Sequence, residues 1–306
     1  MKVLLPIDGS AAASDAVKFV RSLADNQTVD VIVVMVSYDP SKYSFQPWVP
    51  EWTVQENARA EATLSKAKQL LAETCNSVLT IHGSGAPIPF LLKQAIDSDV
   101  DLIVLGAVGH SAVSRLLLGS VSDTIASQAK CSVVVVRPSD NDTGRPQRLV
   151  LAYDRSAASR EAVAELMQWN LRGDTKVDVV SVVQNPFIFV GEGYVAEPNM
   201  VTPEQIQPVS ETAERMASQI ADHFHQTQSH VPVADHIGDA IVQAAQKEKA
   251  ELIIVGDTGH SLLGELFLGS TSKYVLRHAP CSVWISRHHY KSDKSAREND
   301  DAVAAS

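Results

Sequence analysis

The chain alternates short, uninterrupted apolar runs with longer stretches whose apolar residues recur every three or four positions. Such runs predict strands buried on both faces, and the longer period predicts amphipathic helices. The expected strands are residues 3–7, 29–36, 78–82, 102–105 and 132–136, then 149–153, 177–183, 231–236, 252–255 and 282–286. The expected helices are residues 14–24, 56–71, 90–96 and 121–129, then 161–171, 210–223, 241–248 and 272–278. This alternation is typical of an α/β fold with a doubly wound parallel sheet, which has helices on both faces.

The second half of the chain repeats the first. Residues 106–137 align without a gap to residues 256–287, and 14 of the 32 positions are identical. The offset is far longer than a solenoid repeat of about 20–50 residues, so each copy is a whole domain. The segment between the copies is polar and rich in Pro, Gly and Asp, and the last residues show no periodicity. We expect two tandem doubly wound domains at 1–137 and 148–287, a linker at 138–147 and a disordered tail at 288–306.

Composition and charge limit the possible functions. The 306 residues have a formal net charge of −10, whereas non-specific binding to nucleic acid or to anionic membranes needs a basic face. No signal-like segment precedes the first expected strand, and no apolar run is long enough to cross a bilayer. Cys75, Cys131 and Cys281 show neither metal-ligand spacing nor a disulfide framework. We expect a cytoplasmic protein with no nucleic-acid partner, no membrane partner and no metal-binding motif.

Each half has the same glycine and serine pattern directly after its fourth expected strand. Glycine lets the backbone approach a ligand closely, because it has no Cβ. The Gly-Ser pair opens the following helix, where amides without intrahelical partners and the helix dipole favour an anion. The pattern is Gly-x2-Gly-x9-Gly-Ser, at Gly106, Gly109, Gly119 and Ser120 and again at Gly256, Gly259, Gly269 and Ser270. It predicts a phosphate site in each half, unless the glycines are only turn residues kept since the duplication.

An aspartate follows the first expected strand of each half, Asp8 in the first and Asp154 in the second. Ligands of open α/β sheets bind at the carboxyl ends of strands, where the strand order reverses. If the first and fourth strands are neighbours, Asp8 flanks the same crevice as Gly106, and Asp154 the same crevice as Gly256. An aspartate there can accept a hydrogen bond from a ribose hydroxyl or an adenine amino group. Alternatively, both aspartates serve only as turn or helix-cap residues.

These motifs resemble those of the universal stress protein family. The resemblance rests on Pro6-x-Asp8-Gly9-Ser10, Asp154 and the two glycine–serine patterns, and it extends over nearly all of both halves. It implies a five-stranded parallel sheet of order 3-2-1-4-5 in each half and membership of the subclass that binds ATP. It also implies a role in stress response. The halves would pair like a fused dimer through their last strands, and two chains could form a further homodimer.

The same resemblance implies roles for individual residues. Asp8 and Asp154 would contact adenosine, and the backbone of Val36 and Val182 would meet adenine. The glycines of both patterns, with Ser120 and Ser270, would hold the phosphates. The two sites are not expected to be equal, because the first loop contains Arg115 where the second contains Glu265. An arginine favours a triphosphate and a carboxylate opposes it, so we expect tighter binding in the first half.

Three functions are consistent with these features. The first is an adenine-nucleotide-binding sensor or regulator, whose ligand is ATP, ADP or AMP with or without Mg²⁺. The second is a slow ATPase or phosphotransferase, which ranks lower because the loops show no evident base, lysine or paired Mg²⁺ carboxylates. The third is a tandem scaffold that binds protein partners and no nucleotide.

Overall fold

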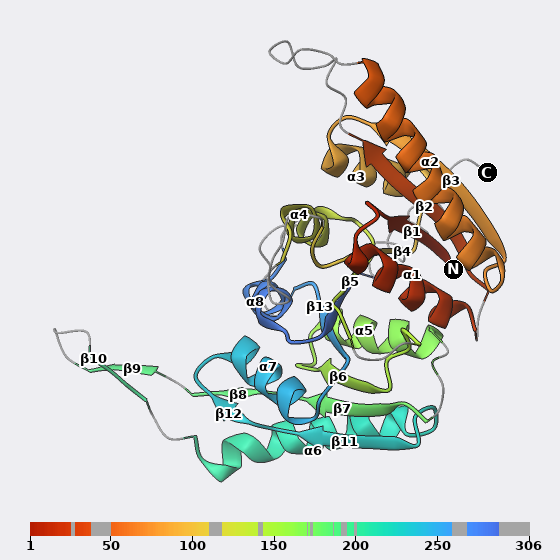
Figure 1. Ribbon diagram of the computed structural model, residues 1–306. Helices are drawn as coiled ribbons and strands as arrows, with labels where there is room; N and C mark the ends of the chain where they lie inside the picture. The colour runs from red at the N-terminus through yellow and green to blue at the C-terminus, as the bar shows by residue number, and fades with distance from the viewer. Residues whose placement is uncertain are drawn as a thin grey trace, which may run out of the picture.

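The fold is taken from a computed structural model (Figure 1). It describes residues 1–25, 28–37, 50–109, 118–139, 143–169, 171, 174–185, 187–190, 195–198, 201–258 and 268–287. The two halves share one ten-stranded sheet with the order β11-β7-β6-β13-β14-β5-β4-β1-β2-β3. Each half contributes five parallel strands in the order 3-2-1-4-5, as the family resemblance implied. The halves meet through β5 and β14, which pair antiparallel with Val134 opposite Trp284.

The elements of the first half follow the predicted β/α alternation. They are β1 (Lys2–Pro6), α1 (Ala11–Ala24), β2 (Asp30–Ser37), α2 (Pro50–Ala72), β3 (Ser77–Ser84), α3 (Pro87–Asp97), β4 (Leu102–Gly106), α4 (Ser120–Gln128) and β5 (Ser132–Val136). The second half repeats this order with β6 (Arg148–Ala152), α5 (Ala157–Gln168), β7 (Lys176–Val180), α6 (Pro203–Ile220), β11 (Gln226–His230), α7 (Ile237–Lys247), β13 (Leu252–Gly256), α8 (Ser270–His278) and β14 (Ser282–Ser286).

The sheet is covered on both faces, which explains the apolar runs. Along β1, Val3 and Leu5 lie in one hydrophobic core and Leu4 in the other, and all three are fully buried. The first core also contains buried residues of α1, α2, α5 and α6, and the second contains buried residues of α3, α4, α7 and α8. Every central strand therefore needs apolar side chains at successive positions rather than at alternate ones.

One predicted strand is in the wrong place. The apolar residues near Val231 predict a strand at 231–236, but the sheet strand of this region is β11, Gln226–His230, which pairs with β7. Its residues are polar because β11 is an edge strand of the sheet and is partly exposed. Residues Val233–Ala234 form only the short strand β12, which pairs with β8 (Val183–Gln184). The strands β9 (Phe187–Val190) and β10 (Val195–Pro198) form a hairpin that projects from the second half (Figure 1).

Two buried arginines tie the halves together in a nearly symmetric way. Arg137, which follows β5, donates from its amide to Ser282 Oγ at 3.1 Å and from Nη2 to the carbonyl of Leu276 in α8 at 3.0 Å. Arg287, which follows β14, donates from its amide to Ser132 Oγ at 2.9 Å and from Nη2 to the carbonyl of Ala126 in α4 at 2.6 Å. The guanidinium groups thus satisfy carbonyls at the end of the partner half's helix.

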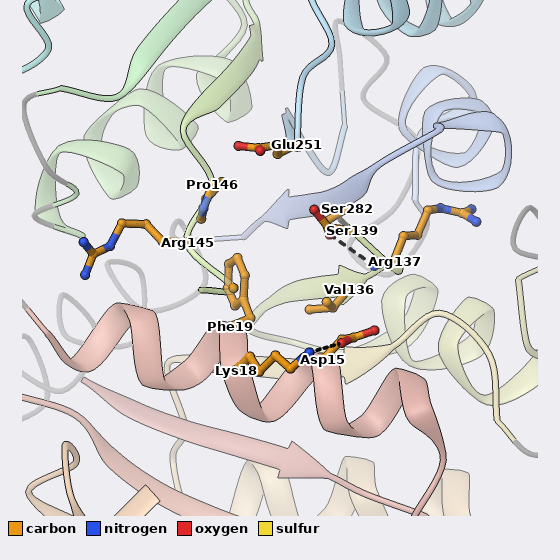
Figure 2. A pocket seen from close by; sticks show the side chains of 11 residues that line it. Asp15, Lys18, Phe19, Val136, Arg137, Ser139, Arg145, Pro146, Glu251 and Ser282 are labelled. Atoms are coloured by element: carbon orange, nitrogen blue, oxygen red, sulfur yellow. Dashed lines mark hydrogen bonds and ion pairs between the residues drawn. The ribbon is translucent and has the colours of Figure 1, made fainter. Parts of the chain in front are cut away.

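A small cavity of about 30 Å³ lies beside this junction (Figure 2). Phe19 of α1 faces it together with Val136 and Ser282 of the two central strands. The equivalent of Phe19 in the second half is Glu165 of α5, counted from Asp8 and Asp154. Glu165 is 5% exposed, and its Oε2 accepts hydrogen bonds from Ser132 Oγ at 2.8 Å and Ser286 Oγ at 2.6 Å. One hydroxyl therefore comes from each half, and a polar group replaces the aromatic ring.

Candidate functional site

The carboxyl ends of β1 and β4 lie side by side, because these strands pair with Val3 opposite Leu102. This adjacency brings together the aspartate and the glycine pattern of the first half. An ideal Cβ on Gly109 would lie only 2.7 Å from Asp8 Oδ2. A side chain at position 109 would therefore displace the Asp8 carboxylate, so glycine is required for this close approach. The predicted neighbourhood of the two motifs is confirmed.

Gly106 and Gly256 have a packing role. A Cβ on Gly106 would lie 2.7 Å from the backbone carbon of Ala12 in α1, and a Cβ on Gly256 would lie 2.8 Å from Ala158 Cβ in α5. The first helix of each half thus lies directly on the end of its fourth strand. These two glycines set how closely that helix approaches the crevice, whether or not a ligand is bound.

The Gly-Ser pair of each glycine pattern opens a helix as predicted, and the glycine is the N-cap. Gly119 and Gly269 are the N-cap residues of α4 and α8. Their amides are already engaged, since Gly119 donates to the carbonyl of Ala107 and Gly269 to that of Asp257, both at 2.7 Å. Ser120 and Ser270 are the first helical residues and are exposed.

A different serine closes this turn in each half. Ser122 Oγ donates to the carbonyl of Gly106 at 2.8 Å, and Ser272 Oγ donates to that of Gly256 at 2.6 Å. Both serines are about 95% buried. They tie the start of the helix to the end of the fourth strand, which fixes the two ends of the glycine loop close together. The sequence motif did not predict this structural role, because the Gly-Ser pair contains the serine two positions earlier.

Asp8 and Asp154 have the turn role that the sequence left open as an alternative. Asp8 Oδ1 accepts a hydrogen bond from the amide of Ser10, and Asp154 Oδ1 accepts one from the amide of Ser156, both at 2.9 Å. Ser10 and Ser156 are in turn the N-caps of α1 and α5. Only one oxygen of each carboxylate is used in this bond. This hydrogen bond orients the carboxylate, and it does not exclude contact between the carboxylate and a ligand.

The second half has a cavity of about 280 Å³ at the carboxyl ends of β6, β7 and β13. The sequence-predicted Asp154, Val182 and Gly256 all line it. Further lining residues come from α6 and α7, namely Val209, Thr212, Ile237 and Ile241. Helix periodicity identifies such residues only as a buried face and does not indicate that they line a site. Tyr153, Ser181, Thr258 and Thr271 complete much of the remaining wall.

The strand ends of the two halves differ in polarity at equivalent positions. Thr258 and Thr271 of the second half correspond to Val108 and Val121 of the first, by the gapless alignment of the glycine patterns. In addition, Asp257 takes the place of Ala107. Asp257 is 2% exposed, and its Oδ2 lies 3.5 Å from Nε of Arg287, so its charge is compensated. The second crevice therefore offers more hydroxyl groups near the glycine loop.

Some predicted residues cannot be placed. Gly259, Arg115 and Glu265 lie outside the described residues, so the expected difference between the two loops stays a prediction. Val36 lies at the end of β2, partly buried against the second core. It is the counterpart of Val182 in the sheet, since β2 and β7 pair in the same register with β1 and β6.

Comparison with known proteins identifies the repeated unit. The model of the universal stress protein family matches residues 1–137 and 146–287. A universal stress protein of Mycobacterium tuberculosis strain H37Rv is 27% identical over 300 residues, which cover 93% of this chain and 96% of that protein. A universal stress protein of Bacillus subtilis is 30% identical over 145 residues, or 44% of this chain and 98% of the relative.

A solved structure of similar length has the same overall fold. The crystal structure of a universal stress protein from Archaeoglobus fulgidus covers 94% of this chain with a TM-score of 0.69 and 17% identity, and 98% of that chain is matched. A universal stress protein crystallised in complex with cAMP covers 45% of this chain, and 98% of it is matched, with 26% identity and a TM-score of 0.36. Among the described residues, no helix is long and apolar enough to span a membrane. By the family model matched in both halves, the chain belongs to the universal stress protein family.

Proposed function

We propose that this chain is a regulatory universal stress protein that binds an adenine nucleotide, with a crevice for it in each half. The observation that supports this most is the cavity of the second half. It unites the aspartate turn, the glycine of the fourth strand and the start of α8 at the strand ends where α/β proteins bind ligands. Its volume of about 280 Å³ is close to the lower limit, on the order of 300 Å³, of small-molecule sites.

The lining suits a nucleoside phosphate. Val182, Ile237 and Ile241 offer apolar surface for a base, and Asp154 offers a carboxylate for a hydroxyl or amino group. Thr271 and Ser272 lie in the first turn of α8, where the amides and the helix dipole favour a phosphate. We place ATP first among the ligands, with ADP and AMP as alternatives. Mg²⁺ would be held by the phosphates and water rather than by a cage of protein ligands.

A regulatory role is favoured over turnover by the charged groups at the cavity. Among the described residues that line it, Asp154 and Arg155 are the charged ones. Nucleotide hydrolysis needs groups that orient water and neutralise charge in the transition state. We therefore propose that the nucleotide is sensed rather than consumed, in a protein that acts in the cytoplasm as part of a stress response.

The proposal is tested first by mass spectrometry of the supernatant after denaturing the purified chain, which should release an adenine nucleotide. Titration of ATP into the full chain then locates the second-half site. Val209→Trp places an indole at the cavity wall and should weaken binding there at least tenfold. Glu211→Trp, which is exposed on the same helix, is the matched control and should bind normally. Absence of nucleotide and of ATP binding in the unmodified chain would contradict the proposal.

A further inference from the structure

A second cluster of polar side chains lies on the α7 face of the second half, and its residues are not among those that line the cavity at the strand ends. Asp178 of β7, His230 of β11 and Glu248 at the C-cap of α7 approach one another there. Their nearest ligand-type atoms all lie within 4.8 Å of one another. Asp178 is fully buried, whereas the side chains of His230 and Glu248 are 30% and 17% exposed. The cluster is thus anchored at depth and open to solvent on one side.

The first half has no such chemistry at the equivalent positions. Asp178 corresponds to Ile32, because the two occupy the same register between the first, second and third strands of their halves. By the same register, His230 corresponds to Ile81, and the C-cap residue of α3 is Ser98 where α7 has Glu248. An apolar position buried in one copy has therefore become a charged one in the other. Stability alone does not explain this, since a buried ion pair is seldom more stable than well-packed apolar residues.

Lys176 and His230 lie against different oxygens of the two carboxylates. Lys176 Nζ lies 3.3 Å from Asp178 Oδ2 and 2.9 Å from Glu248 Oε2. His230 Nε2 lies on the other oxygens, 3.3 Å from Asp178 Oδ1 and 3.9 Å from Glu248 Oε1. Among the described residues, no hydrogen-bond donor reaches the buried Asp178 Oδ2, which forms an ion pair with the Lys176 ammonium group. The ammonium group orients the carboxylates and leaves one oxygen of each turned toward the imidazole.

We infer that Asp178, His230 and Glu248 form a binding site for a divalent transition metal ion of the Zn²⁺ class. Tetrahedral zinc takes imidazole nitrogen and carboxylate oxygen at about 2.0–2.2 Å, which places neighbouring ligand atoms about 3.3 Å apart. The distance from His230 Nε2 to Asp178 Oδ1 already matches this value. Glu248 must approach His230 Nε2 by about half an ångström, and it must approach Asp178, from which it lies within 4.8 Å, by at most about 1.5 Å. Its place at the end of a helix, partly exposed, allows that movement. A water molecule would complete the coordination from the open side.

The surroundings fit a metal site beyond its three ligands. Gln228, adjacent on β11, donates its side-chain amide to Asp178 Oδ1, and Lys176 holds the outer oxygens. Such outer contacts orient metal ligands in proteins. With a neutral imidazole, the cluster and Lys176 sum to one negative charge, so a divalent cation is attracted. The presence of histidine favours zinc-like ions over Mg²⁺ and Ca²⁺, which prefer oxygen ligands.

The test uses the full chain, freed of metal with a chelator, in competition with a chromophoric chelator for Zn²⁺. The unmodified chain should bind one more equivalent of Zn²⁺ than His230→Gln, whose affinity at this site should fall at least tenfold. Glu248→Gln should weaken binding in the same direction. His225→Gln, exposed in the connection before β11, is the matched control and should bind like the unmodified chain.

Thermal unfolding of each variant without metal shows that the fold is retained. Added Zn²⁺ should raise the melting temperature of the unmodified chain and of His225→Gln, but not of His230→Gln, because only a ligand of the native state stabilises it. Equal Zn²⁺ affinity in the unmodified chain and His230→Gln would overturn the inference. So would absence of Zn²⁺ binding by the unmodified chain, which would leave an ion-pair cluster only.

Discussion

Replacing Glu165 should change how the stability of this protein depends on pH. The carboxyl group lies in the core between the halves beside Trp284, whose ring stacks on that of Trp169 with the centroids 3.3 Å apart. Burial raises its pKa from the ordinary 4.5 to about 7, although the hydroxyls of Ser286 and Ser132 oppose the rise. The native state therefore holds this proton more tightly than the unfolded chain does.

The sign and size of the effect follow by linkage. Glu165 contributes its full stability below about pH 4.5, and that contribution is lost as the pH rises through about 7. A tenfold change in proton affinity corresponds to about 1.4 kcal/mol, so the whole loss is about 3 kcal/mol. Glu165→Gln is neutral at every pH and lacks this loss. Relative to the unmodified protein, the variant should thus gain about 3 kcal/mol between pH 4.5 and pH 8.

The assay is urea unfolding of both proteins at pH 4.5 and pH 8. For each protein, the change in unfolding free energy between the two pH values is measured, and the change for the unmodified protein is subtracted from that for the variant. All other titrating groups are shared, so they cancel. Glu73→Gln, a change at an exposed carboxylate, serves as the control and should give nearly zero. A gain of less than about 1 kcal/mol for Glu165→Gln, or a loss, would refute the reasoning.

Three further changes test the packing around the crevices and the junction. Gly256→Ala should destabilise the fold by about 1–3 kcal/mol in urea unfolding, because the new Cβ would lie 2.8 Å from Ala158 Cβ. Gly119→Ala should destabilise the fold less, because its Cβ would lie 3.3 Å from the nearest atom. The reverse order would contradict the packing role of Gly256. Ser272→Ala should cost about 1 kcal/mol by leaving the carbonyl of Gly256 without its 2.6 Å hydrogen bond, and an unchanged urea midpoint would exclude this role. Trp284→Ala should cost about 3–5 kcal/mol in the same assay, since the ring is fully buried, and a cost below 1 kcal/mol would show that the junction repacks.

Much of the fold could be predicted from local patterns. The apolar runs gave the ten sheet strands with one misplacement, and the three-to-four spacing gave the helices with shifted ends. The misplaced strand shows the limit of this reasoning. Gln226–His230 is polar because it forms the edge of the sheet, and edge position is a property of the whole sheet rather than of the segment.

The candidate site was predicted only in part. Asp154 and Gly256, predicted from the motifs, and Val182, implied by the family resemblance, line the cavity, because each lies at or just after the end of a strand and the carboxyl ends of parallel strands meet at one edge. The walls from α6 and α7 were not predicted, since a helical face that lines a cavity has the same spacing as one that packs in the core. The turn role of Ser272 was missed for a similar reason, because its acceptor lies 16 residues away in the chain.

The sequence by itself showed the duplication, the α/β class and the positions of the aspartate and glycine motifs, because each of these depends on local periodicity or on spacing along the chain. The tertiary structure alone decided which distant residues meet. It placed Glu165 between one serine from each half, and it gathered Asp178, His230 and Glu248 from three separate elements. Contacts between residues distant in the chain depend on strand order, register and helix packing. Two halves with matching motifs therefore have different side chains in contact at equivalent positions.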